Sequence, residues 1–129
     1  MPVRVEKLEE RILLHIVEGE ETYNDVDLSE RQDLMLCQDI HGPVFRIIDA
    51  RDWLPDFSSL MMVIAEIARL KRHEHGDFYD VMVSSDEMIR FGAQSMAQTQ
   101  YGSLDVPVFD DFEAAISYVH ELLRVENIS

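Results

Sequence analysis

The chain of 129 residues has one cysteine, five scattered glycines and no long apolar run. A single cysteine cannot form an internal disulfide, so we expect a fold without covalent cross-links. No stretch approaches the roughly 20 apolar residues that span a bilayer, and the start at Met1-Pro2-Val3-Arg4 lacks the apolar core of a signal peptide. We therefore expect a soluble, cytoplasmic protein that does not insert into membranes.

Positive charge is scarce. The sequence has 11 lysines and arginines against 26 aspartates and glutamates, a formal net charge of −15. A field of this sign repels phosphate backbones and anionic lipid surfaces. Nucleic acid is therefore excluded as an expected partner.

Signatures of common enzyme classes are also missing. No Gly-x-Gly-x-x-Gly turn, phosphate-binding loop or Gly-x-Ser-x-Gly elbow occurs in the sequence. Cys37 stands among Leu34, Met35 and Leu36 in a helical pattern, where a nucleophile would be poorly presented and a small buried side chain is the simpler interpretation. We expect no catalytic residues, no metal site and no cofactor.

What the sequence does contain is the pattern of one α/β domain over residues 1–129. Short apolar segments indicate strands near 3–8, 11–17, 43–50, 78–83 and 106–109, and three- and four-residue spacings indicate helices over 26–40, 57–72, 84–97 and 110–124. The first two strands predict a hairpin, and the helices between the later strands predict parallel pairing. The fold class is α/β, with a mixed five-stranded sheet in the order β-β-α-β-α-β-α-β-α.

Details within these segments give further predictions. Leu28, Gln32, Met35, Leu36 and Ile40 predict the buried stripe of the first helix. Ser84 with Glu87, and Asp110 with Glu113, predict capping boxes for the last two helices. Residues 52–56 are interpreted as a loop.

Three acidic residues follow the strand at 43–50. Asp49, Asp52 and Asp56 lie at its carboxyl end, where ligands and partners usually meet open α/β sheets. Paired carboxylates are ligands for a divalent cation, but helix capping and solvation also account for them. We favour the second interpretation.

The passage Val44-Phe45-Arg46-Ile47-Ile48-Asp49-Ala50-Arg51-Asp52, leading to Asp56-Phe57-Ser58-Ser59-Leu60, resembles the STAS superfamily, closest to its bacterial SpoIIAA-like branch. The resemblance spans nearly the whole chain. Anti-sigma factor antagonists of this superfamily carry an Asp-Ser-Ser-Gly-Leu motif at the start of a helix. Asp56, Ser58, Ser59 and Leu60 correspond to it approximately, with Phe57 inserted and the glycine missing.

The resemblance implies a SpoIIAA-like fold with helices packed on the sheet, and a regulatory, non-catalytic role in binding a protein partner. It also implies a protein partner of the anti-sigma or kinase type, and phosphorylation of Ser58 or Ser59. Self-association is the alternative to such a partner. Asp49, Asp52 and Asp56 are the accompanying candidates for partner binding. A plain helix cap at Asp56 or Ser58 is the simpler alternative for these residues.

A second functional hypothesis is the binding of a small apolar, lipid-like ligand. The sequence has seven methionines, whose flexible side chains suit such a site. Ordinary core packing is the competing interpretation. The candidate residues are Phe57, Met61, Phe91 and Tyr101.

Overall fold

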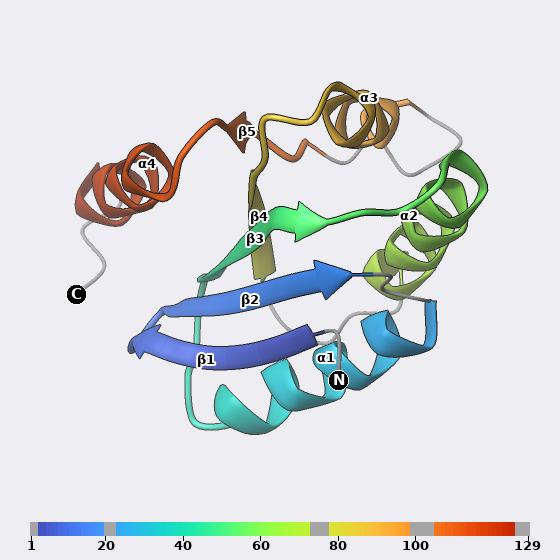
Figure 1. Cartoon of the computed structure of the whole chain (residues 1–129). Helices are drawn as coiled ribbons and strands as arrows, with labels where there is room; N and C mark the ends of the chain where they lie inside the picture. Colours follow the sequence, from blue (N-terminus) through green and yellow to red (C-terminus); the bar gives the residue numbers. More distant parts are fainter. Residues whose placement is uncertain (1–2, 20–22, 73–77, 99–104, 126–129) are drawn as a thin grey trace.

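The computed structural model describes residues 3–19, 23–72, 78–98 and 105–125, and these ranges form a five-stranded sheet with four helices (Figure 1). The predicted element order is confirmed. In chain order the elements are β1 (Val3–Glu9), β2 (Ile12–Gly19), α1 (Tyr23–Leu36), β3 (Val44–Trp53), α2 (Phe57–Arg72), β4 (Phe78–Val83), α3 (Glu87–Ser95), β5 (Val108–Phe109) and α4 (Phe112–Val125). None of the helices in the described ranges is both long and apolar enough to cross a bilayer.

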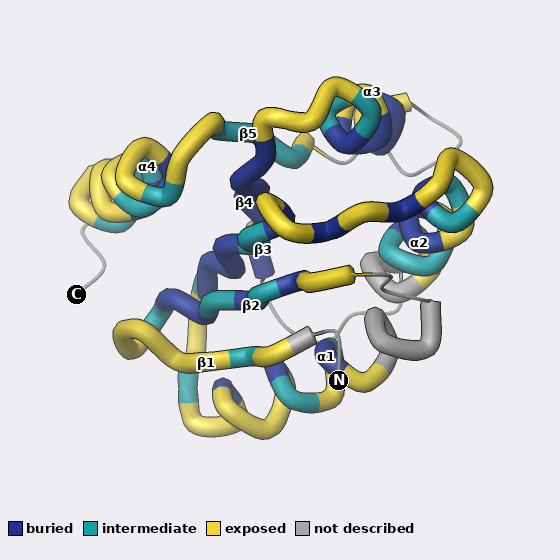
Figure 2. The backbone as a smooth tube through the Cα atoms, viewed as in Figure 1, coloured by how far each residue is buried: buried dark blue, intermediate teal, exposed yellow. Residues whose placement is uncertain are grey.

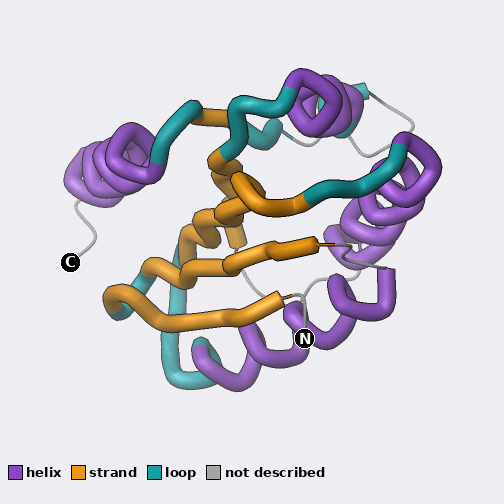
Figure 3. Tube along the Cα trace, viewed as in Figure 1, coloured by secondary structure: helices purple, strands orange, loops and turns teal. Residues whose placement is uncertain are grey.

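The sheet is mixed, as predicted. Its strands lie side by side in the order β1-β2-β3-β4-β5 (Figure 3). Strand β1 is antiparallel to β2, and the other neighbours are parallel. The hairpin turns at Glu10 and Arg11, and Val5 is the register partner of His15. Each parallel pair is joined through a helix because a parallel connection must return to the starting edge of the sheet.

The two faces of the sheet carry different helices. Alternate residues of β2, β3 and β4 point to opposite faces, so the sheet buries one set of side chains against α1, α2 and α3 and another against α4. Figure 1 shows α4 on the opposite side of the sheet from α1 and α2, and Figure 2 shows the buried strands between them. The α4 side is closed by residues such as Ile47, Val81 and Val119.

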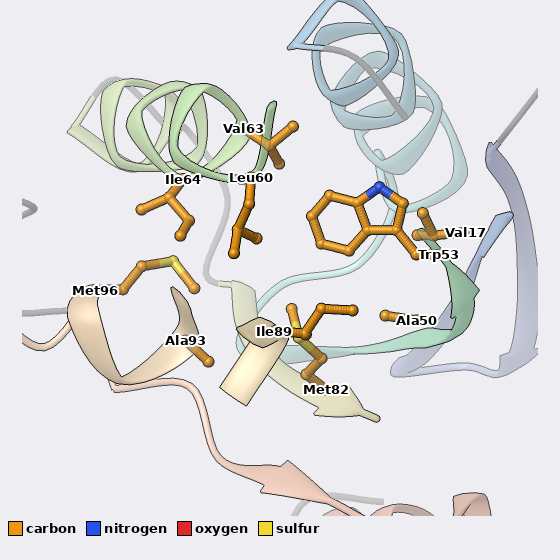
Figure 4. Packing of buried hydrophobic residues seen from close by; sticks show 10 residues of the cluster. All are labelled: Val17, Ala50, Trp53, Leu60, Val63, Ile64, Met82, Ile89, Ala93 and Met96. Carbon is orange, nitrogen blue, oxygen red and sulfur yellow. The ribbon is translucent and has the colours of Figure 1, made fainter. Parts of the chain in front are cut away.

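The larger core lies between the sheet, α2 and α3 (Figure 4). Trp53 lies on the side of this core next to Val17 and is almost fully buried, with Leu60 and Val63 of α2 beside the indole ring. The prediction of a loop over 52–56 was therefore wrong at its start, because β3 continues through Trp53 to bury the indole ring. Only Leu54, Pro55 and Asp56 connect β3 to α2.

The first helix also differs from its prediction. It spans Tyr23–Leu36 instead of 26–40, and Leu28, Met35 and Leu36 of the predicted buried stripe are exposed. The side of α1 that is buried carries Ser29 and Asp33 instead. These polar residues face inward because the strands beneath α1 present charged partners, described below.

Candidate functional site

Three helices begin with an aspartate at the carboxyl end of the parallel strands. Asp56 Oδ1 accepts a hydrogen bond from the Ser59 amide at 2.7 Å, at the start of α2. Asp86 Oδ1 accepts from the Met88 amide at 2.8 Å at the start of α3, and Asp111 Oδ1 accepts from the Ala114 amide at 2.8 Å at the start of α4. Each carboxylate satisfies an amide that has no partner within its own helix.

The capping boxes predicted at Ser84 and Asp110 were wrong. The Ser84 amide still donates to the Phe109 carbonyl at 2.9 Å, so Ser84 remains paired to β5 and the helix starts later. Its hydroxyl accepts from the Asp86 amide at 3.1 Å. Asp110 forms an ion pair with Arg90, and Asp111 caps α4 in its place. The capping interpretation of Asp56, in contrast, agrees with the structure.

Asp49 has a different role from Asp56. Arg51 donates to the two oxygens of Asp49 from Nε at 2.9 Å and Nη2 at 2.8 Å, and these bonds hold the pKa of Asp49 below its ordinary value. By strand alternation Asp49 lies on the face of β3 that α4 covers, whereas Asp56 caps a helix on the other face. Asp52 is exposed near the end of β3. The described residues contain no group of three or more His, Cys, Asp or Glu arranged to hold a metal ion.

The two candidate serines lie in the first turn of α2. Ser58 is exposed, and Ser59 is half-buried. Hydrogen bonds from Ser59 to the carboxylate lower the pKa of Asp56. The bond from the backbone amide has the larger effect and the bond from the side chain the smaller one. A phosphate on Ser59 would therefore be placed beside a charge of the same sign.

Two candidate aromatic residues meet where α2 and α3 approach each other. The rings of Phe57 and Phe91 have centroids 6.5 Å apart at an interplanar angle of 34°. The helices come close at Gly92, where a Cβ atom would lie 2.7 Å from Cδ1 of Ile64. Phe57 is 57% exposed and Phe91 52% exposed, so the pair lies on the surface above this contact.

A third apolar residue, Leu54, is 71% exposed in the connection just before α2. We call Leu54, Phe57 and Phe91 the seam surface. Met61, the remaining described candidate for an apolar ligand, is partly buried and packs against the core between α2, α3 and the sheet. Tyr101 lies outside the described residues.

A buried ionic cluster between α1 and the sheet was not predicted. Arg46 of β3 donates from Nε to Asp80 Oδ1 of β4 at 2.5 Å and from Nη2 to Asp80 Oδ2 at 3.0 Å. Its Nη1 donates to Glu30 at 2.6 Å and to Asp33 at 3.1 Å, both on α1. The guanidinium also lies 4.5 Å from the ring centroid of Phe78. We call Glu30, Asp33, Arg46 and Asp80, together with His15 of β2, the ionic cluster.

The ionic cluster is closed to solvent at its centre. Asp33 is fully buried, and its Oδ1 is 2.6 Å from Nε2 of His15. Burial by itself would lower the pKa of Arg46, but Asp80, Asp33 and Glu30 raise it well above its ordinary value. The sequence signal was a charged residue in each of two apolar strands, Arg46 after Phe45 and Asp80 before Val81. The cluster joins α1 to three strands and lies apart from the seam surface.

Comparisons with known proteins were made for both sequence and structure. No protein-family model matches the sequence, and no curated protein matches it. Among solved structures, the chain is similar to an uncharacterised protein of the DUF3478 family from Shewanella loihica PV-4, which has a SpoIIAA-like fold. The two are 12% identical, the match covers 90% of each chain, and the TM-score is 0.61.

At this level of identity the similarity concerns the backbone architecture. It agrees with the mixed sheet, its strand order and the placement of the four described helices. The α/β fold predicted from the sequence is thus confirmed. The chain has a SpoIIAA-like fold, the fold of STAS domains.

Proposed function

We propose that this chain is a non-catalytic regulatory module that binds a protein partner through the seam surface. The observation that carries the proposal is the contact of Phe57 with Phe91 on the surface, both rings being more than half exposed, together with the exposure of Leu54 in the connection just before α2. Large apolar side chains grouped on a surface are typical of interaction sites, and aromatic residues dominate binding energy in many interfaces.

The position of the seam surface supports the proposal. It lies at the end of the sheet where β3 leads into α2, and open α/β sheets usually meet ligands and partners at the carboxyl ends of their strands. The SpoIIAA-like fold supports a STAS-like role. The ionic cluster is the other concentration of functional groups, and its burial suits a structural role joining α1 to the sheet.

The binding of a small apolar ligand remains the alternative. Phe57 and Phe91 would then enclose the ligand together with Met61, yet both rings are more than half exposed and Met61 packs against the core. A pair of exposed rings suits a protein surface better than an enclosed ligand. Native mass spectrometry of the purified protein tests the alternative, which predicts a co-purified lipid.

Phosphorylation at the start of α2 is the proposed mode of regulation. A phosphate on Ser58 or Ser59 would add about −1.5 to −2 charge next to Phe57 and Asp56. The added charge would repel the neighbouring carboxylates. Removing water from the phosphate would also cost free energy when the partner covers this apolar surface. Ser58→Glu and Ser59→Glu should therefore weaken partner binding, because the cost of placing a hydrated charge against the apolar contact at Phe57 exceeds what one exposed carboxylate gains from a cation on the partner. Ser117→Glu on the distant helix α4 should leave binding unchanged.

Site-specific photo-crosslinking in the native host tests the proposal. A photoreactive phenylalanine analogue replaces Phe91 in one version of the full chain and Met35, on the exposed side of α1, in the control. We expect a distinct protein to be captured from position 91 and not from position 35. Recovery of the same proteins from both positions would contradict the seam surface as the docking site. Capture of a second copy of this chain from position 91 alone would identify the partner as self.

A further inference from the structure

We infer that the partner presents a cationic segment to the seam surface, with an aliphatic or aromatic anchor for the rings and lysines or arginines around it. This inference rests on the proposed function and adds the chemistry of the partner. It follows from the charges that surround the three apolar side chains.

Exposed carboxylates flank each part of the seam surface. Glu87 precedes Phe91 by four residues on α3, a spacing that places both on one side of the helix. Asp56 directly precedes Phe57, and Asp52 lies two residues before Leu54. All three acidic residues are exposed. The apolar patch therefore has an acidic border.

The neighbouring arginines are already engaged. Arg51 pairs with Asp49 through two hydrogen bonds, and Arg90 pairs with Asp110. Within the described parts of the chain, Asp56 and Glu87 form no ion pair, and Asp52 shares the charge of Arg51 with Asp49. A positive group on a partner would supply the missing counter-charge, and an acidic partner would be repelled.

The exposed rings favour the same kind of partner. The face of an aromatic ring attracts a lysine or arginine cation as well as an apolar side chain. Arg46 already lies over the Phe78 ring in the interior, which shows this contact within the same molecule. Phe57 and Phe91 offer two such rings on the surface.

A designed peptide provides the probe while the natural partner is unidentified. It is an amphipathic helix of about 18 residues, five turns, with leucine and tryptophan on one side and lysine and arginine on the other. A twin peptide carries glutamate in place of every lysine and arginine. Binding of each to the isotopically labelled full chain is mapped by amide chemical-shift changes in NMR spectra.

Mapping is essential because a net charge of −15 attracts a basic peptide to any surface of the molecule. The test variant is Asp52→Asn with Glu87→Gln. The matched control is Glu6→Gln with Glu10→Gln, two exposed residues on β1 and in the β1–β2 turn that remove the same amount of charge. Neither variant touches a helix cap.

We expect the basic peptide to shift the resonances around Leu54, Phe57 and Phe91, with the acidic twin leaving them unchanged. The test variant should bind the basic peptide about fivefold more weakly than the control does. Raising the salt concentration from about 0.05 to about 0.5 M should reduce that difference in affinity, because salt shortens the distance over which the charges interact.

Two results would overturn the inference, and they are distinguishable. If both peptides bind equally well at the seam surface, the surface docks partners as proposed but its charge does not select them. If the basic peptide shifts residues elsewhere, or the control weakens binding as much as the test variant, the seam surface is not the docking site and the proposed function fails with it.

Discussion

The helices α1 and α2 cover the same face of the sheet, yet they turn opposite kinds of side chain toward it. The buried side of α2 carries Leu60, Val63 and Ile64. The buried side of α1 carries Ser29 and Asp33, while Leu28 and Met35 face solvent. The difference originates in the strands, because Arg46 and Asp80 lie beneath α1 and apolar side chains lie beneath α2. A helix therefore buries whichever side matches the strands that it covers.

The largest effect should come from removing the central cation of the ionic cluster. Arg46→Met leaves Asp33 and Asp80 buried without their guanidinium partner, and such a loss typically costs about 3–5 kcal/mol. Urea denaturation should show this decrease in the free energy of unfolding. Adding Asp33→Asn and Asp80→Asn to the same chain should recover part of it, because the unpaired charges are then gone. A loss below about 1 kcal/mol for Arg46→Met would mean that the ionic cluster does not hold α1.

An apolar truncation on α2 gives the matching measurement for the other helix. Leu60 is 2% exposed and contacts the core around Trp53. Leu60→Ala should lower the free energy of unfolding by about 3 kcal/mol, through lost burial and the remaining cavity. The measurement belongs to the same urea series as Arg46→Met. A decrease in the free energy of unfolding below about 1 kcal/mol would show that α2 is not held by this core.

A smaller effect should appear in acid at the Asp49–Arg51 pair. Because Arg51 lowers the pKa of Asp49 in the folded state, the pair stabilises the fold above the ordinary aspartate pKa of about 3.9 and loses this contribution as pH falls through the lowered value. Arg51→Ala should raise the pKa of Asp49 in an NMR titration. The stability difference between the wild type and this variant should shrink below about pH 4. An unchanged Asp49 titration would show that the pair does not form in solution.

The smallest effect is expected on the exposed side of α1. Met35 is 73% exposed, so Met35→Gln should change the free energy of unfolding by no more than about 0.5 kcal/mol. The stripe predicted from the sequence required Met35 to be buried, which would make this substitution costly. Thermal unfolding of the variant beside the wild type separates the two arrangements.

The sequence predicted the element order because turn residues and changes of periodicity mark the boundaries of most segments. The hairpin, the four helices of the described ranges and the mixed sheet all follow from such local signals. Errors arose where a boundary depended on pairing between distant segments. Ser84 stays outside α3 because its amide donates a hydrogen bond to the Phe109 carbonyl, and β3 continues to Trp53 because the indole fits the core.

The ionic cluster could not be predicted from local sequence patterns, because it also depends on pairing between distant segments. His15, Arg46 and Asp80 stand on three strands and meet only through the register of the sheet, and Asp33 joins them from a helix. For the candidate site, the sequence left the cap of α2 open between Asp56 and Ser58, and it named Phe57 and Phe91 for an apolar ligand and not for a protein partner. It missed Leu54 because a leucine between Trp53 and Pro55 carries no sign of exposure.

The seam surface is tested most directly by comparing two surface variants in binding to the partner captured by crosslinking. Phe57→Ser with Phe91→Ser alters the seam surface, and Leu28→Ser with Met35→Ser alters the exposed side of α1; isothermal titration calorimetry gives the dissociation constants. The account predicts at least about a tenfold weaker complex for the first variant and an unchanged one for the second, since aromatic anchors typically contribute more than about 1 kcal/mol each. Equal affinity of the first variant and the wild type would contradict it.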